Sequence, residues 1–173
     1  MKIPFTTALI IGSSRGIGRG IAVKLAREGV QKIAVHYRTR KKEAETTVSQ
    51  LRQAGATGAL VQGDVSDPTV AENIVKQPAE KLGGCDIFIL SVVPPLEEIY
   101  EHTLATEVPL AKWQLAFDTQ ARGFFVCART AARYMPRKLC TEEAGFLTGQ
   151  TICVDGGSSL MNPDFPLALQ VPA

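Results

Sequence analysis

The fold is decided by one stretch near the N-terminus, Gly12-Ser13-Ser14-Arg15-Gly16-Ile17-Gly18. The apolar run that leads into it, Ala8-Leu9-Ile10-Ile11, has the character of a strand buried on both faces. An amphipathic helix is predicted to follow from Ile17 to Glu28, and Gly29 is predicted to end it. A glycine turn in this position lets backbone N–H groups approach a pyrophosphate at the helix N-terminus. We therefore predict a dinucleotide-binding unit in which all seven residues contact the cofactor.

The spacing of these glycines is G-x-x-x-G-x-G, which differs from the more general G-x-G-x-x-G. Three glycines in seven residues also occur in tight turns that bind no ligand. The buried strand before the turn and the amphipathic helix after it favour the ligand-binding interpretation.

Strands and helices continue to alternate as far as residue 90. Strands are predicted at Lys32–Tyr37, Ala59–Val61 and Asp86–Leu90, and helices at Lys41–Ala54 and from Asp67 to Gly83. Asp67 is the predicted cap of the second of these helices, and Pro78 is expected to kink that helix or end it early. Strands that alternate with helices in this way need right-handed crossovers. The fold class is therefore α/β, a shortened Rossmann-type doubly wound parallel sheet with three α/β/α layers.

The pattern changes after the fourth predicted strand. We expect a long loop from Val92 to Pro109, with a helical turn near Ile99, and then a helix over Ala111–Tyr134 that bends at Gly123. Beyond Pro136 the sequence predicts a helical turn and a last strand, at Glu142–Phe146 and Gln150–Val154. We interpret residues 1–173 as a single domain, with its main part in 1–137 and a C-terminal strand and tail in 138–173.

Composition excludes several classes of protein. Hydrophobic residues make up 45% of the chain, charged residues make up 21%, and the net charge is +2, which is not typical of a nucleic-acid binder. No apolar run is long enough for a membrane helix, and residues 1–7 do not resemble a signal peptide. None of the four cysteines forms a C-x-x-C pair, so we expect no metal site and buried, reduced thiols. These features predict a cytoplasmic protein.

The end of the second predicted strand indicates which dinucleotide is bound. Enzymes that prefer NAD usually place an acidic residue about 20 residues past the glycines, where it holds the ribose hydroxyls. This chain instead has His36-Tyr37-Arg38-Thr39-Arg40, and the first acidic residue after that strand is Glu43. Arg38 is predicted to pair with a 2′-phosphate, with Arg15 beside it. The pattern favours NADP(H) over NAD(H), and a solvated basic helix start is the alternative.

The third predicted strand is followed by Asp64-Val65. At the carboxyl edge of the sheet, Asp64 would accept a hydrogen bond from the adenine amino group and Val65 would pack on its ring. An aspartate after a strand is also common turn chemistry, so this pair alone does not decide the matter.

Taken together, these motifs resemble the short-chain dehydrogenase/reductase family, and are nearest to 3-oxoacyl-carrier-protein reductase-like and enoyl-reductase-like members. The glycine turn matches the family signature T-G-x-x-x-G-I-G with Ile11 in place of threonine, and Asp64-Val65 matches its adenine contact. Thr119 to Phe125 matches the family's central helix, with Gln120 in place of asparagine, and residues 148–157 match its C-terminal strand and turn. The family's N-N-A-G is Leu90-Ser91-Val92-Val93 here, so Ser91 would keep part of its cofactor role.

The resemblance also indicates what is absent. The family's strand with the catalytic serine and its helix with Y-x-x-x-K should lie near Arg137–Leu139, where the start and end of the family pattern meet directly. Tyr134 and Lys138 fit Y-x-x-x-K, but Pro136 between them disrupts the helical turn, so we interpret the match as chance and assign no catalytic residue. The family's fifth strand would also be missing, which would leave the fourth strand at an open edge. Either Gln150–Val154 or a partner chain could cover that edge.

The resemblance implies an NADP(H)-dependent oxidoreductase by descent. Its substrate would be a carbonyl or enoyl compound, either a small molecule or one linked to an acyl carrier, and turnover would be impaired in this form. The alternatives are a non-catalytic nucleotide-binding or subunit-interaction module, and a shortened product without function. Because the helix over Ala111–Tyr134 forms a dimer contact in the family, a homo-oligomer is expected.

Overall fold

A computed structural model describes residues 5–94 and 105–135, which lie within the unit Met1–Pro136. In this part of the chain, four parallel strands form one sheet in the order β3-β2-β1-β4, with bounds β1 Thr7–Ile11, β2 Lys32–Tyr37, β3 Thr57–Gln62 and β4 Ile87–Leu90. The chain builds outward from β1 to β3 and then returns to the other side of β1. Ligands of such sheets bind where the strand order reverses, which here is at the carboxyl ends of β1 and β4.

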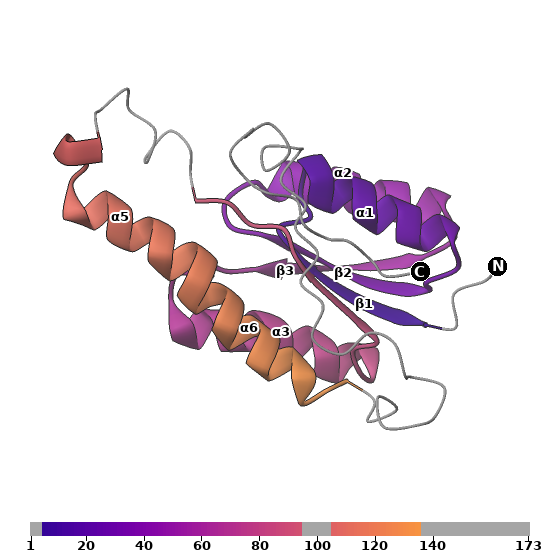
Figure 1. Cartoon of the computed structure of the whole chain (residues 1–173). Coiled ribbons are helices and arrows are strands. Elements are labelled where there is room, and N and C mark those ends of the chain that lie inside the picture. The colour runs from indigo at the N-terminus through magenta and orange to yellow at the C-terminus, as the bar shows by residue number, and fades with distance from the viewer. Residues whose placement is uncertain (1–4, 95–104, 136–173) are drawn as a thin grey trace, which may run out of the picture. The chain divides into compact units, whose positions relative to one another are not determined.

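Helices cover both faces of this sheet and complete the predicted three-layer α/β/α arrangement (Figure 1). On one face, α1 (Gly16–Arg27) and α2 (Lys41–Gln53) enclose a core with Ile10, Ile33 and Leu51. On the other face, α3 (Pro68–Leu82) and α6 (Gly123–Ala132) enclose a second core, to which buried residues of β1 contribute. The α/β class is therefore confirmed, while the extent of a single domain over residues 1–173 stays a prediction.

The third strand is longer than its apolar residues indicate. It was predicted at Ala59–Val61 and extends over Thr57–Gln62, because its backbone pairs with β2 along the whole length from Lys32 to Tyr37. A strand ladder is made of backbone hydrogen bonds, so it continues past the point where the side chains become polar.

The ends of α3 follow the sequence signals, but its interior does not. The Asp67 carboxylate accepts hydrogen bonds from the amides of Thr69 and Val70, and Gly83 ends the helix with a φ of 84°. Of the two effects predicted for Pro78, a kink or an early end, the early end is wrong, because the helix continues to Leu82. Pro78 is itself buried, so its packing offsets the backbone hydrogen bond that proline cannot make.

The predicted helix over Ala111–Tyr134 consists of three segments. They are α5 (Leu110–Phe117), a π-helical segment (Asp118–Arg122) and α6, and a 3-10 turn at Ala105–Glu107 precedes them. A Cβ atom on Gly123 would lie 2.7 Å from the carbonyl oxygen of Val65, so a glycine is needed where α6 meets the loop after β3. The π-helical segment ends at Arg122, directly before Gly123, the position at which a bend was predicted. The predicted elements near Ile99, at Glu142–Phe146 and at Gln150–Val154 lie outside the described residues.

Two glycines of α1 allow a matched test of this packing. A Cβ atom on Gly18 would lie 2.3 Å from the carbonyl oxygen of Gly12, whereas a Cβ atom on Gly20 would meet no atom within 4 Å. Gly18→Ala is expected to lower the free energy of unfolding by about 2 kcal/mol or more, as overpacking does. Gly20→Ala is expected to raise it by about 1 kcal/mol through helix propensity. Urea unfolding of both variants measures the difference, and equal effects would contradict the close approach of α1 to the turn.

Candidate functional site

The glycine turn leaves the carboxyl end of β1 and passes close to the end of β4. Gly12 has a φ of 86° and Gly16 a φ of 58°, which is a region of backbone conformation that glycine adopts without strain. A Cβ atom on Gly12 would lie 2.2 Å from the carbonyl oxygen of Ser91, and the Ser91 amide donates to the Ile11 carbonyl at 2.8 Å. The structure thus brings Ser91 beside the turn, as the sequence predicted.

Two side chains hold the carbonyl oxygens of the turn on the α2 side. The buried hydroxyl of Thr47 lies 3.1 Å from the carbonyl oxygens of both Ser13 and Ser14. Arg19 of α1 donates from Nε to the Ser14 carbonyl at 3.1 Å and to the Thr47 hydroxyl at 2.9 Å. Its Nη2 atom donates to the Glu43 carbonyl of α2 at 3.0 Å. The conformation of the turn is therefore fixed by both helices on this face.

This arrangement determines where the next amide groups point. The described peptide bonds are trans, so the C=O of one residue and the N–H of the next residue point in opposite directions. With the carbonyls of Ser13 and Ser14 directed at Thr47 and Arg19, the amides of Ser14 and Arg15 point away from α2. Arg15 is the N-cap of α1 and its side chain makes no capping hydrogen bond. The outward amides and the positive end of the α1 dipole suit an anion such as a diphosphate.

On its other side, the turn is held by His36, for which the sequence analysis gave no role. The Gly12 amide donates to His36 Nδ1 at 3.1 Å, and His36 Nε2 lies 3.0 Å from the Gly63 carbonyl oxygen. Since Nδ1 accepts a hydrogen bond, the proton of the neutral ring is on Nε2, which donates to Gly63. The available sequence signal was a histidine in an otherwise apolar strand, because a buried imidazole needs hydrogen-bond partners.

The pKa of His36 is lowered to about 4, mainly because burial disfavours the charged ring. The hydrogen bond to the Gly63 carbonyl and the nearby Asp64 carboxylate oppose this effect without overcoming it. The ring is therefore neutral at pH 7 and keeps one acceptor and one donor.

Ser13 does not take the role predicted for it. Its side chain is fully buried, and its hydroxyl donates to the Ile10 carbonyl at 2.6 Å and accepts from the His36 amide at 3.0 Å. Its own amide donates to the His36 carbonyl at 3.2 Å. Ser13 therefore joins β1 to β2, and its polar groups are already bound within the protein.

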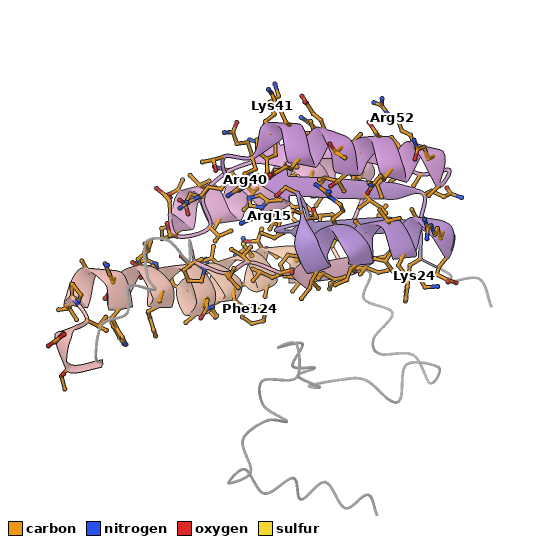
Figure 2. The ribbon with its side chains drawn as sticks, turned by 90° about the horizontal axis from the view of Figure 1, so that it is seen from above. Arg15, Lys24, Arg40, Lys41, Arg52 and Phe124 are labelled. Carbon is orange, nitrogen blue, oxygen red and sulfur yellow. The ribbon has the colours of Figure 1, made fainter. Side chains whose placement is uncertain are left out.

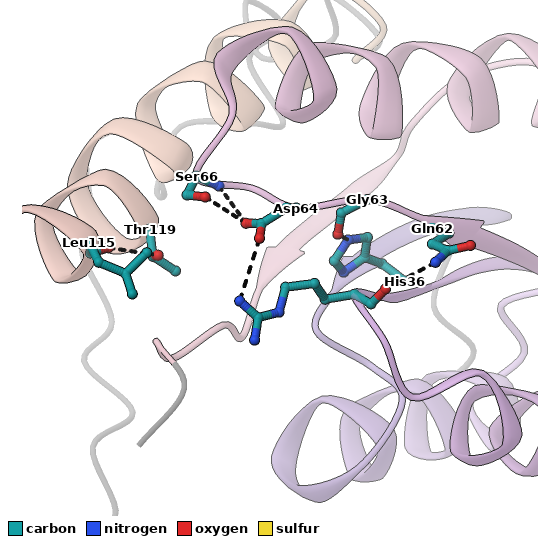
Figure 3. Close-up of polar contacts among 8 residues, drawn as sticks. His36, Gln62, Gly63, Asp64, Ser66, Leu115 and Thr119 are labelled. Carbon is teal, nitrogen blue, oxygen red and sulfur yellow. Dashed lines mark hydrogen bonds and ion pairs between the residues drawn. The ribbon is translucent and has the colours of Figure 1, made fainter. Parts of the chain in front are cut away.

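Asp64 and Arg38, two predicted cofactor contacts, lie next to each other. Asp64 Oδ1 accepts from the Ser66 amide at 3.0 Å and from the Ser66 hydroxyl at 2.7 Å, and Asp64 Oδ2 lies 3.4 Å from Arg38 Nη1 (Figure 3). Partial burial raises the pKa of Asp64, but the Ser66 and Arg38 contacts outweigh it and leave that pKa below its usual value. The Arg38 and Asp64 side chains are 39% and 40% exposed, so a ligand can reach this pair.

Val65 lies beside Asp64, but its side chain points into the protein. It is 3% exposed and belongs to the core beneath α3 and α6. The prediction that Val65 packs on an adenine ring does not fit this placement, because the apolar surface that the ring would need is already covered. The sequence pattern did not show that α6 packs over this position.

The entrance to the turn is basic and partly apolar. Figure 2 shows Arg15 and Arg40 near the starts of α1 and α2. Arg40 lies 3.2 Å from the Glu43 carboxylate, and Arg15 is exposed. Ile17 is 54% exposed, which is unusual for an isoleucine in the first turn of a helix packed on a sheet.

Tyr134 lies at the opposite edge of the sheet from the glycine turn. Its carbonyl accepts from the amide of Cys85, which precedes the start of β4, whereas Ser91 follows the end of β4 beside Gly12. The Tyr134 hydroxyl donates to Glu80 of α3 at 3.1 Å. Partial desolvation and Glu80 raise its pKa. Tyr134 and the glycine turn are therefore attached at opposite ends of β4, and Lys138 lies outside the described residues.

Residues 5–94 and 105–135 contain no cluster of His, Cys, Asp or Glu that could hold a metal ion, and no helix long and apolar enough to cross a membrane. Cys85 and Cys127 are buried free thiols, and burial raises the pKa of each to about 12. The prediction of unreactive buried cysteines is thus confirmed for these two, and Cys140 and Cys153 lie outside the described residues.

Comparisons with known proteins identify one family for this chain. A family model for short chain dehydrogenases matches residues 6–144. The chain belongs to the short-chain dehydrogenase/reductase family. The 3-oxoacyl-(acyl-carrier-protein) reductase FabG of Staphylococcus aureus is 30% identical over 132 residues, which are 76% of this chain and 51% of that protein.

Solved structures of the family resemble this chain to a similar extent. A dehydrogenase/reductase from Sinorhizobium meliloti 1021 has a TM-score of 0.69 at 30% identity, over 78% of this chain and 51% of its own. A short chain dehydrogenase from Burkholderia cenocepacia J2315 in complex with NADP has a TM-score of 0.68 at 28% identity, over 75% of this chain and 51% of its own. The predicted family is confirmed, and the chain spans about half the length of these relatives.

The burial of His36 predicts an acid-dependent loss of stability. The folded pKa of about 4 lies below the unfolded value of 6.5, so the unfolded chain binds more protons between these pH values. Stability is therefore expected to fall as pH drops from 6.5 to 4, by about 3 kcal/mol in total. His36→Gln, which cannot titrate, should lack this component in urea unfolding across that range. Parallel pH profiles of the two proteins would contradict the burial of a neutral ring.

Proposed function

We propose that this chain binds a nicotinamide dinucleotide at the carboxyl edge of its sheet, NADP(H) in preference to NAD(H). The observation that carries the proposal is the anchoring of the Ser13 and Ser14 carbonyls by Thr47 and Arg19, which directs the next amides outward at the start of α1. The proposed contacts of this turn and its neighbour strand are Gly12, Ser14, Arg15, Gly16, Ile17, Gly18 and Ser91. A relative with 28% identity was solved in complex with NADP, which supports the same ligand here.

The preference for a 2′-phosphate rests on Arg38 and Arg15. An exposed ion pair such as Arg38–Asp64 is weak, so a phosphate with nearly two negative charges can compete for the guanidinium. Arg15 is exposed at the start of α1 and would add a second positive charge. Asp64, held by Ser66, would remain available to accept from the adenine amino group.

The activity that we propose is that of an oxidoreductase by descent, with little or no turnover in this form. A bound nicotinamide supplies hydride transfer to a carbonyl or enoyl group, in a small molecule or one linked to an acyl carrier, as the name of the FabG relative suggests. The chain must supply the proton, yet Tyr134 lies at the far edge of the sheet and no serine occurs between Ser91 and Ser158. The alternative is a module that binds nucleotide or a subunit without catalysis.

Self-association is the second part of the proposal. Helices α5 and α6 expose large apolar side chains, of which Leu110 is 77%, Trp113 55% and Phe124 51% exposed. Trp113 and Phe117 stack with their ring centroids 5.5 Å apart. Exposed apolar side chains of this size favour burial against another protein surface, and a second copy is the partner that we propose. A monomer in sedimentation equilibrium would contradict it.

Cofactor preference can be tested by calorimetric titration of the full chain with NADP⁺ and NAD⁺. The unchanged protein is expected to bind NADP⁺ more tightly, and Arg38→Ala should weaken NADP⁺ binding by about tenfold, the value of a charged hydrogen bond, without a comparable loss for NAD⁺. Arg52→Ala, at the other end of α2, is the matched control and should change neither affinity. Absence of binding to either nucleotide would overturn the proposed function.

Turnover can be tested by following NADPH oxidation over a panel of carbonyl and enoyl compounds. We expect rates near the uncatalysed background, and Tyr134→Phe should leave any residual rate unchanged because the hydroxyl is bound to Glu80. Rapid oxidation that Tyr134→Phe abolishes would show that the tyrosine supplies the proton after all.

A further inference from the structure

The His36 ring occupies a place between the two ends of the proposed site. On one side it accepts from the amide of Gly12, the first residue of the glycine turn. On the other side it donates to the carbonyl of Gly63, the residue before Asp64. Figure 3 shows the ring against Gly63, with Asp64 and Ser66 next along the chain. One imidazole thus connects the turn that would hold the diphosphate to the loop that would hold the adenosine.

We propose that His36 is a positioning residue for nucleotide binding, which sets the glycine turn and the Asp64 loop at a fixed separation through its neutral Nε2–H ring. This inference rests on the proposed function. His36 contacts no ligand in this scheme and acts through Gly12 and Gly63. Displacements of about 1 Å are enough to weaken contacts in a site that relies on oriented backbone amides, so the ring affects affinity without touching the nucleotide.

The backbone of the strand that carries the His36 ring is itself held by hydrogen bonds. The amide and hydroxyl of Ser13 are bound to the His36 backbone and the Ile10 carbonyl, so the strand under the ring is fixed. A Cβ atom on Gly12 would lie 2.2 Å from the Ser91 carbonyl oxygen, so the turn passes close to the end of β4 at this residue. Since the ring accepts from the Gly12 amide, a shift of the ring would disturb the hydrogen bond that holds the start of the turn.

Burial keeps the ring neutral, although the nearby Asp64 carboxylate favours the charged form. Asp64, in the loop after β3, is the charged group that acts on His36, and its carboxylate is shared with Ser66 and Arg38. The turn after β1 and the end of β3 meet the ring through backbone groups of Gly12 and Gly63. A doubly protonated ring would present an N–H to the Gly12 N–H and would lose that hydrogen bond.

Glutamine is the conservative replacement. Its side-chain amide offers one acceptor and one donor and does not titrate, so it can accept from Gly12 and donate to Gly63. Leucine has similar bulk and neither group, and would leave a buried amide and a buried carbonyl without partners. The contrast between the two variants therefore separates hydrogen bonding from the filling of space.

The experiment uses the full ¹⁵N-labelled chain and NADP⁺. Long-range ¹H–¹⁵N correlation spectra at pH 7 are expected to show a neutral ring protonated at Nε2, and His36→Gln assigns those signals by removing them. Calorimetric titration should give His36→Gln an affinity within about threefold of the unchanged protein and His36→Leu a loss of about tenfold or more, as expected for buried groups without partners. Val75→Ala, a destabilising change at a fully buried residue of α3, is the control for stability and should bind within about twofold.

The outcomes distinguish a failure of the proposed function from a failure of this inference alone. If the unchanged protein does not bind NADP⁺, the proposed function and this inference both fail. If it binds and His36→Leu binds equally well, this inference alone fails. Should His36→Leu not fold, a ring protonated at Nδ1 or on both nitrogens at pH 7 would still overturn it, because either state excludes the hydrogen bond from Gly12.

Discussion

The structure depends on the glycine turn after β1. Side chains of α1 and α2 bind its carbonyl oxygens, and β2 binds its first amides. Thr47 and Arg19 bind its carbonyl oxygens from the helical side. On the strand side, the ring and the backbone carbonyl of His36 accept from its first amides, those of Gly12 and Ser13. A peptide plane held at its carbonyl has its N–H direction determined as well, because the trans bond admits no independent rotation. The outward orientation of the Ser14 and Arg15 amides is therefore a consequence of contacts made elsewhere. The amides proposed to hold a diphosphate are thus oriented by neighbouring residues, while Arg38 and Asp64 would add side-chain contacts.

The sheet topology explains why this turn can be reached by a ligand. Because β4 pairs with β1 on the side opposite β2, the strand order reverses beside the glycine turn, which is where ligands of such sheets bind. Gly12 and the Ser91 carbonyl lie close together at this point. The Arg38–Asp64 pair lies toward the β3 side, so a dinucleotide would extend across the edge from β4 toward β3.

Much of this could be predicted from the sequence, because local signals and the final structure agree. The glycine turn, the apolar strands and the Asp67 cap each depend on interactions within a few residues. The errors arose where distant elements decide the outcome. The length of β3 follows from its pairing with β2, the survival of α3 beyond Pro78 follows from burial, and the inward side chain of Val65 follows from its cover by α6. His36 belongs to the same group, since its two partners lie 24 and 27 residues away.

The family motifs alone do not show that Tyr134 and the glycine turn lie at opposite ends of β4. Cys85 and Ser91 flank β4 at opposite ends, and each end is attached to a different part of the molecule, Tyr134 at one and Gly12 at the other. A group that lies at the amino edge of a parallel sheet cannot serve a ligand at the carboxyl edge without dismantling β4. Within the described residues, the groups proposed to bind a dinucleotide therefore lie at one edge, while the tyrosine that fits the family's catalytic spacing is bound to α3 at the other. In the proposed scheme binding and catalysis are separable, since binding depends on the glycine turn, Arg38 and Asp64, and catalysis depends on side chains that later elements must bring to this edge.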